Sequence, residues 1–382
     1  MDSIRGETLA NDDEDDEDVV IYFHDPVEVH PRSSWTGLCP PLVSARRVHI
    51  SKAMNPRVID LFGYARPDAV ITKGGTPVVS IEQTTMNPSG HNIPQRFSFH
   101  CRAAELGVPS ILYYPEHAKR KFSDPNERNL QVRVPLAQKR LTSIYSVPAL
   151  SVFWPTNPKT KLPDGNVNVQ TEMPALVEEI LENNGSKGTT LVTVTSALAK
   201  MDAAVAKYAS DPNDYDQNPS VRAIFADGLP TSMTPGGFAI DPPNTSTLFR
   251  TPDFLDSLKS FTKKSYWNEI EEKLLKRELT LVFHGTANHK GTDSEHPWPG
   301  YLTLLDILYL RKDGGRSHND RVGNLVYDLP VKLDTFILRL LKKRKPTATR
   351  IVDSFADLVM LEDGIVAGEP MRVSRQIEPI AE

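Results

Sequence analysis

The chain has 382 residues, 39% of them hydrophobic and 24% charged, and its formal net charge is −5. No apolar run approaches the roughly 18 residues that a membrane-spanning helix needs. The N-terminus lacks the basic region and apolar stretch of a secretory signal, and the two cysteines, Cys39 and Cys101, are too few for a disulfide framework or a four-thiolate zinc site. We therefore expect a cytoplasmic protein without a membrane partner.

The charge is distributed unevenly along the chain. Residues 1–18 contain nine acidic side chains and one basic side chain, Arg5, so their net charge is −8 and the chain total of −5 leaves +3 for the remainder. Adjacent like charges repel one another and bury nothing, so we predict that 1–18 is a disordered acidic leader. Two interpretations stay open for it: a solubilising tail, or a mimic of nucleic acid that competes for a basic surface.

The first half of the chain alternates between strand and helix patterns. In chain order we predict a strand at Val19–Phe23, a helix through 50–62 interrupted by Pro56, a β-hairpin of Arg66–Lys73 and Pro77–Thr84, a helix at Gln95–Leu106, a strand at Val108–Tyr114, a helix at Leu136–Tyr145 and a strand at Ala149–Trp154. This order is typical of an α/β fold, with a mixed sheet flanked by helices.

The second half is predicted to be α-rich. It follows a hinge at Glu182–Thr190, a segment without an apolar anchor. The expected segments are a partly helical one at Leu191–Tyr208, a surface loop over 211–247, two helices within 254–275, a strand at Leu279–His284, and segments at Tyr301–Leu310, Leu333–Lys343 and Ile351–Leu361. We therefore divide the chain into the leader, a domain at 19–181 and a C-terminal domain at 191–382 for substrate recognition or assembly.

The hairpin carries the residues with the clearest chemistry. A two-residue turn of Gly74 and Gly75 would place Asp68 opposite Ile81, whereas a three-residue turn would place Asp68 opposite Glu82. In the second register Asp68, Glu82 and Thr84 share one face, because strand side chains alternate. Two adjacent carboxylates repel unless a cation lies between them, and Mg²⁺ prefers such oxygen ligands.

These residues resemble the motif of the PD-(D/E)XK nucleases, which have the restriction-endonuclease-like fold. Thirteen residues separate Pro67-Asp68 from Glu82-Gln83-Thr84. The resemblance implies that Asp68 and Glu82 bind the metal, Mg²⁺ or alternatively Mn²⁺. It also implies that Gln95, and with it Arg96, assists from the following helix. The order of elements over about 20 to 160 matches the family core.

The sequence departs from the family pattern at one catalytic position. Thr84 stands where the family has a lysine that positions or activates the attacking water. Gln95, Arg96 or Lys73 would have to replace that lysine. Arg96 and His100 lie one helical turn apart, and two interpretations are open for them: contact with phosphate, or a solvated helix face. The second interpretation is a degenerate site that only binds nucleic acid.

Two basic clusters agree with a nucleic-acid partner, although each is also typical of a solvated surface. The first comprises Lys119, Arg120, Lys121, Arg128, Arg133, Lys139 and Arg140, and the second comprises Arg339, Lys342, Lys343, Arg344, Lys345 and Arg350.

His284-Gly285-Thr286 follows the strand at Leu279–His284 and allows three interpretations. His289, Asp293, Glu295 and His296 are nearby, but their spacing fits no compact zinc pattern. The Phe-His-Gly-Thr string also resembles the start of the nicotinamide-binding site of ADP-ribosyltransferases. A plain polar loop is the third interpretation.

The resemblance leads to one functional hypothesis and two alternatives. The hypothesis is a metal-dependent endonuclease that hydrolyses phosphodiester bonds of double-stranded DNA, plausibly in restriction or phage defence, with catalytic residues Asp68, Glu82, Thr84, Gln95 and Arg96. A homodimer is expected of an enzyme that cuts both strands. The alternatives are a noncatalytic nucleic-acid-binding protein on the same fold and a transferase centred on His284.

Overall fold

A computed structural model of the chain describes residues 18–25, 35–84, 92–119, 127–161, 172–185, 188–208, 237–239, 246–259, 264–285, 298–317, 320–332, 334, 336, 351–352, 354–367 and 377–379. Residues 1–17 of the predicted leader, most of the predicted loop over 211–247 and the second basic cluster lie outside these residues.

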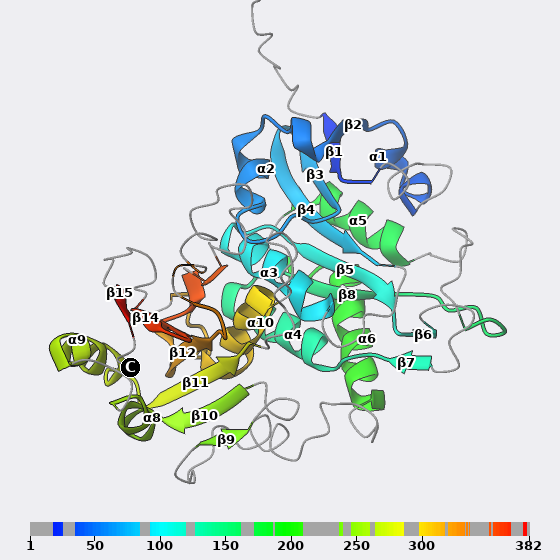
Figure 1. Cartoon of the computed structure of the whole chain (residues 1–382). Helices are drawn as coiled ribbons and strands as arrows, with labels where there is room; N and C mark the ends of the chain where they lie inside the picture. The colour runs from blue at the N-terminus through cyan, green and yellow to red at the C-terminus, as the bar shows by residue number, and fades with distance from the viewer. Residues whose placement is uncertain are drawn as a thin grey trace, which may run out of the picture.

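The first sheet has six strands within the described residues, in the order β2-β1-β3-β4-β5-β8 (Figure 1). The strands are β1 Val19–Phe23, β2 Arg46–His49, β3 Ala69–Lys73, β4 Thr76–Gln83, β5 Ser110–Pro115 and β8 Ala149–Trp154. β1, β3 and β4 pair antiparallel, whereas β4, β5 and β8 run parallel. The parallel strands need crossover connections, which the helices between them supply.

Helices cover both faces of this sheet. α2 Pro56–Leu61 and α3 Asn92–Glu105 pack on one face, where Val58 of α2 and Ala103 of α3 belong to the same buried cluster as Val70 of β3. α4 Arg133–Tyr145 follows β5. α5 Glu172–Glu182 and the first part of α6 Val192–Tyr208 pack on the opposite face, formed by side chains such as Ile71, Ile81 and Ile111.

α5 and α6 both pack on the first sheet, on either side of the predicted hinge. Val194, Ala197 and Met201 of α6 belong to the same buried cluster as the first sheet. By packing, α6 therefore accompanies the first sheet, although the predicted domain boundary assigned it to the C-terminal region.

The C-terminal region contains a second sheet, which corrects the prediction of an α-rich region. Across the described residues it has seven strands, in the order β15-β14-β13-β12-β11-β10-β9. The strands are β9 Phe238–Ala239, β10 Ser246–Arg250, β11 Leu279–His284, β12 Gly323–Asp328, β13 Leu358–Leu361, β14 Gly364–Ala367 and β15 Ile377–Pro379. β11, β12 and β13 are parallel and buried on both faces, so their short apolar runs lack polar alternation. Of these three strands, only β11 was predicted as a strand.

Helices also flank the second sheet. α8 Thr251–Leu258 and α9 Lys264–Leu274 pack against Val282 and Val326. On the other face lie α10 Trp298–Leu305 and the π-helix η7 Asp306–Leu310. The shorter elements are η1 Trp35–Leu38, α1 Pro40–Val43, η2 Ile50–Lys52, β6 His117–Lys119 and β7 Glu127–Asn129.

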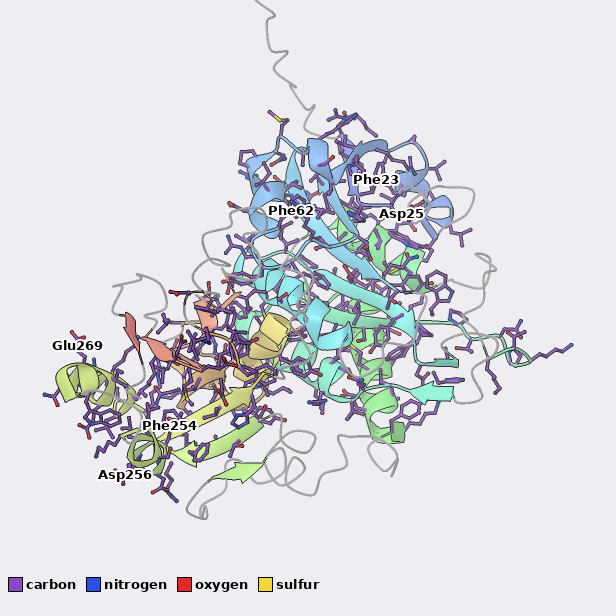
Figure 2. All side chains as sticks on the ribbon, viewed as in Figure 1. Phe23, Asp25, Phe62, Phe254, Asp256 and Glu269 are labelled. Carbon is purple, nitrogen blue, oxygen red and sulfur yellow. The ribbon has the colours of Figure 1, made fainter. Side chains whose placement is uncertain are left out.

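One apolar core joins the two sheets. Phe97, Cys101 and Leu141 of α3 and α4 are buried in the same cluster as Leu302 of α10 and Phe283 of β11. α3 and α4 therefore lie between the sheets, with α10 against α3 (Figure 1). Side chains fill the space between the helices and each sheet (Figure 2).

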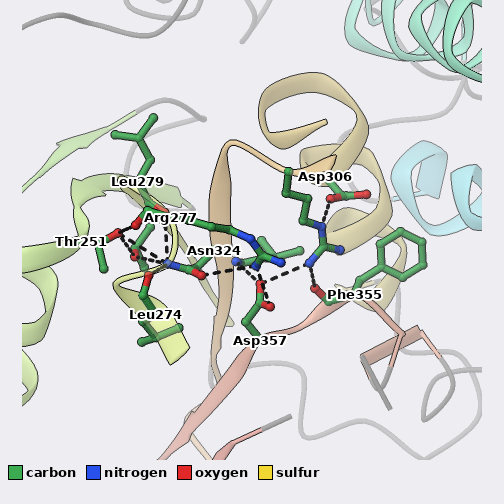
Figure 3. Close-up of polar contacts among 11 residues, drawn as sticks. Thr251, Leu274, Arg277, Leu279, Asp306, Asn324, Phe355 and Asp357 are labelled. Carbon is green, nitrogen blue, oxygen red and sulfur yellow. Dashed lines mark hydrogen bonds and ion pairs between the residues drawn. The ribbon is translucent and has the colours of Figure 1, made fainter. Parts of the chain in front are cut away.

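A buried ion network joins η7 to β12 and β13 (Figure 3). Asp306 is fully buried, and its two carboxylate oxygens lie 2.5 Å from Nε of Arg311 and 2.5 Å from Nε of Arg321. Arg321 also contacts Asp357 at 3.2 Å, and Arg277 contacts the same carboxylate at 2.8 Å. These residues come from separate parts of the second half, so only the folded chain assembles them.

The strands predicted at Val19–Phe23, Ala149–Trp154 and Leu279–His284 are confirmed with the same bounds. Pro56 begins α2 instead of interrupting a longer helix, because proline at the first helical position needs no backbone hydrogen-bond donor. No helix of the described residues is both long and apolar enough to cross a membrane.

Candidate functional site

The turn between β3 and β4 has two residues. Lys73 pairs with Thr76, and both intervening glycines have positive φ, 53° at Gly74 and 68° at Gly75. Two consecutive left-handed residues are typical of a type I′ turn, which glycine adopts without steric cost. The turn is therefore the shorter of the two considered from the sequence.

A β-bulge then changes the register of the hairpin. Thr72 pairs with Pro77 but the preceding Ile71 pairs with Val79, so Val78 is an extra residue in β4. Beyond the bulge Ala69 pairs with Ile81, and continuing that register by one residue places Asp68 opposite Glu82. The backbone positions of Asp68 and Glu82 are therefore opposite each other, as in the register of the three-residue turn, although the turn itself is shorter.

Gly185 packs directly on the bulge. It follows α5 with φ of +61°, and its amide donates to the carbonyl of Ile180. A Cβ at this position would lie 2.9 Å from Cα of Val78. The close contact needs a glycine, so the end of α5 and the bulge of β4 hold each other in place.

Asp68 and Glu82 lie on the face of the sheet that α3 covers. The neighbouring Ala69 and Ile81 point into the opposite core, under α5, and side chains alternate along a strand. Glu82 is only 6% exposed and Asp68 is half-buried. Oδ2 of Asp68 accepts a hydrogen bond of 2.7 Å from the backbone amide of Gln83, which orients this carboxylate toward β4.

Thr84 follows Glu82 at the end of β4. Its amide donates to the carbonyl of Tyr113 at 2.9 Å, which holds the backbone against β5. Gln95 and Arg96 belong to the first part of α3, but their side chains lie outside the described residues. The fold thus brings Asp68, Glu82 and Thr84 to neighbouring positions and does not place the other two side chains.

Within the part of the chain that the structure describes, no group of three or more His, Cys, Asp or Glu side chains is arranged to hold a metal ion. Two carboxylates are nevertheless compatible with Mg²⁺, which usually keeps several water ligands and takes one or two protein carboxylates.

His100 is neither exposed to phosphate nor on a solvated helix face, so both interpretations from the sequence are wrong for this residue. It is fully buried, its Nδ1 lies 2.8 Å from Oγ of Ser110, and its Nε2 lies 2.9 Å from Nε2 of Gln138. Burial lowers the pKa of His100 to about 3, so the imidazole is neutral. Gln138 in turn accepts from Ser151 at 2.6 Å. No spacing in the sequence indicated this network, because its members lie on four separate elements.

The first basic cluster forms intramolecular contacts where its side chains are described. Arg133 is buried, Lys139 pairs with Asp202, and Arg140 pairs with Asp313 at 3.1 Å. Those pairs neutralise part of the charge that was expected to bind phosphate. The second cluster lies outside the described residues.

His284 lies at the carboxyl end of β11, next to the end of β12. Its Nδ1 lies 2.8 Å from Oδ2 of Asp328, and its Nε2 lies 3.1 Å from Oγ1 of Thr247 on β10. The zinc and nicotinamide interpretations depended on residues 286–296, which lie outside the described residues. Sequence reasoning identified His284 but missed Thr247 and Asp328, since neither is near it along the chain.

A comparison of the chain with protein-family models, with curated proteins and with solved structures finds no match. The nuclease resemblance therefore depends on the residues and geometry of the β3–β4 hairpin.

Proposed function

We propose that this protein is a metal-dependent endonuclease that hydrolyses phosphodiester bonds in double-stranded DNA. The observation that carries the proposal is the register of the β3–β4 hairpin, which continues to Asp68 opposite Glu82. Glu82 is buried, and a second carboxylate at the opposite position of the hairpin adds repulsion. A divalent cation between the two carboxylates would reduce this repulsion.

The surrounding elements support this function. The hairpin is followed by α3, by β5 parallel to β4, by α4, and by β8 parallel to β5. The nuclease resemblance implies this succession of hairpin, helix and parallel strand. We accordingly propose a restriction-endonuclease-like core within the first sheet, a homodimer for cutting both strands, and a cytoplasmic role in restriction or phage defence.

In this mechanism Asp68 and Glu82 would hold Mg²⁺ or Mn²⁺ on the α3 face of the sheet. The ion would lower the pKa of a bound water and stabilise the charge that develops on the phosphate. The backbone amide of Gln83 orients Asp68 toward β4. The Thr84 hydroxyl is a neutral hydrogen-bonding group, so Gln95 or Arg96 would supply the contact to water or phosphate that lysine makes in the family.

The departure at Thr84 favours one second function, a noncatalytic nucleic-acid-binding protein. A neutral hydroxyl cannot supply the positive charge of the usual lysine. In that case the hairpin would contribute to binding without cleavage.

The test is a cleavage panel over duplex DNA, single-stranded DNA and RNA, each with Mg²⁺ or Mn²⁺. Asp68→Asn and Glu82→Gln keep the shape of each side chain and remove its charge. We expect each variant to lower the cleavage rate by about 100-fold or more, since a bound metal supplies several kcal/mol of transition-state stabilisation. Asp60→Asn, an exposed carboxylate on α2, is the matched control and should cleave normally.

The outcomes distinguish the two functions. Cleavage that persists in both Asp68→Asn and Glu82→Gln would show that this site assignment is wrong. DNA binding without cleavage under any of these conditions would establish the noncatalytic function. Thr84→Lys restores the family residue, and a faster rate in this variant would show that position 84 faces the reacting phosphate.

A further inference from the structure

The second sheet contains a hydrogen-bonded series of three side chains that the proposed nuclease does not use. Thr247, His284 and Asp328 come from the neighbouring strands β10, β11 and β12. The residues two positions away on the same strands, Phe249, Val282 and Val326, pack together in one apolar cluster. Residues two apart on a strand point to the same face, so Thr247, His284 and Asp328 lie on one face of the sheet.

The hydrogen bonds determine the tautomer of His284. An ionised carboxylate only accepts hydrogen bonds, so Nδ1 of His284 must donate its proton to Oδ2 of Asp328, 2.8 Å away. In the neutral ring, Nε2 then has a lone pair and accepts from the Thr247 hydroxyl at 3.1 Å. This arrangement of hydroxyl, imidazole and carboxylate is the one that activates a hydroxyl nucleophile.

The location of the three residues suits a binding site. His284 and Asp328 end two parallel strands, and ligands of open α/β sheets bind outside the carboxyl ends of such strands. The side chains of His284 and Asp328 are 34% and 37% exposed, so solvent and a small molecule can reach them. The negative charge of Asp328 disfavours an anionic phosphate and favours an uncharged carbonyl group.

We propose that Thr247, His284 and Asp328 form a second catalytic site, which hydrolyses small carboxylic esters through an acyl-threonine intermediate. Oγ1 of Thr247 attacks the ester carbonyl while its proton passes to Nε2 of His284. The bond to the leaving alkoxide breaks, and His284 returns the proton to that alkoxide. Water then attacks the acyl-threonine, gives its proton to His284 and releases the acid, and the proton returns to Thr247. Asp328 is a positioning residue that holds the imidazole in the required tautomer.

The test uses a fluorophosphonate probe, with the labelled residue identified by peptide mass spectrometry, and p-nitrophenyl acetate as the ester. We expect Thr247 to be labelled in the wild type. Thr247→Val and His284→Gln should lower both labelling and ester hydrolysis by about 100-fold or more, the usual contribution of a general base. Thr247→Ser should keep both activities, because serine retains the hydroxyl.

Two controls separate this site from its neighbours. Ser246→Ala removes the adjacent hydroxyl, which belongs to the opposite face of β10, and should leave labelling of Thr247 unchanged. Asp68→Asn should also leave it unchanged, so failure of this site and failure of the nuclease site are distinguishable.

The pH profile separates positioning from a merely structural role. In the wild type the labelling rate should fall in acid, because a protonated imidazole cannot accept the hydroxyl proton. Asp328→Asn should lower the rate and alter this profile. Absence of a label on Thr247 in the wild type, or equal labelling in His284→Gln, would overturn the proposal.

Discussion

Asp306→Asn should destabilise the protein far more than the same substitution at Asp313. Both aspartates pair with arginine, and they differ in burial. Asp306 is fully buried between Arg311 and Arg321, whereas the Asp313 side chain is 89% exposed and pairs with Arg140. The substitution at 306 keeps the shape of the side chain and leaves two buried guanidinium groups with one fewer negative charge.

The magnitude follows from the surroundings of Asp306. Burial is the largest single effect and lowers the pKa of Arg311, but the charge and hydrogen bond of Asp306, together with the charges of Tyr145 and Cys101, raise that pKa overall. The carboxylate therefore holds Arg311 in its charged form. Removing one partner of a buried ion pair costs about 3–5 kcal/mol, while an exposed pair contributes about 1 kcal/mol or less. Asp306→Asn should thus lower the free energy of unfolding by at least about 2 kcal/mol more than Asp313→Asn.

The assay is urea unfolding, followed by tryptophan fluorescence and by circular dichroism. The two signals should change together, because one apolar core joins the two sheets. With a urea dependence of about 3 kcal/mol per molar, a loss of 3 kcal/mol lowers the midpoint by about 1 M. Equal effects of Asp306→Asn and Asp313→Asn would refute the reasoning, since burial would then not determine the strength of these pairs.

Two further predictions concern His100 and Gly185. Burial lowers the pKa of His100 from 6.5 to about 3, so the unfolded chain binds a proton first as pH falls. The free energy of unfolding should therefore fall below about pH 6.5, by about 1.4 kcal/mol per pH unit. His100→Asn should lack this pH-dependent loss, which is measured by comparing urea midpoints across pH. Gly185→Ala should lower the free energy of unfolding by about 1–3 kcal/mol in the same assay. The alanine would have a left-handed backbone, and its Cβ would lie 2.9 Å from Cα of Val78. Gly314 is the control, because it also has a positive φ, +71°, but no atom lies within 4 Å of an added Cβ. Gly314→Ala should therefore lose only the stability that the left-handed backbone costs. An equal loss in Gly185→Ala and Gly314→Ala would contradict the role of the contact with Val78.

Local patterns sufficed for much of the first sheet. Most of its strands are recognisable because their apolar runs are bounded by proline, glycine or polar residues, and β1 and β8 have the predicted bounds. β2 at Arg46–His49 and the covering helix α5 at Glu172–Glu182 were not predicted. The second sheet was largely missed. β12, at Gly323–Asp328, is buried on both faces and so lacks the polar alternation that reveals a half-exposed strand.

The sequence by itself determined that Asp68 and Glu82 belong to one hairpin, because Gly74 and Gly75 separate two β-prone runs. It left the register open between two turn lengths. Only the tertiary structure decided that register, through the bulge at Val78 against which Gly185 packs. The same holds for Thr247, His284 and Asp328, which are far apart along the chain and meet because β10, β11 and β12 are neighbours in one sheet. Short-range sequence patterns encode turns and elements, whereas contacts between distant segments depend on how the sheets assemble.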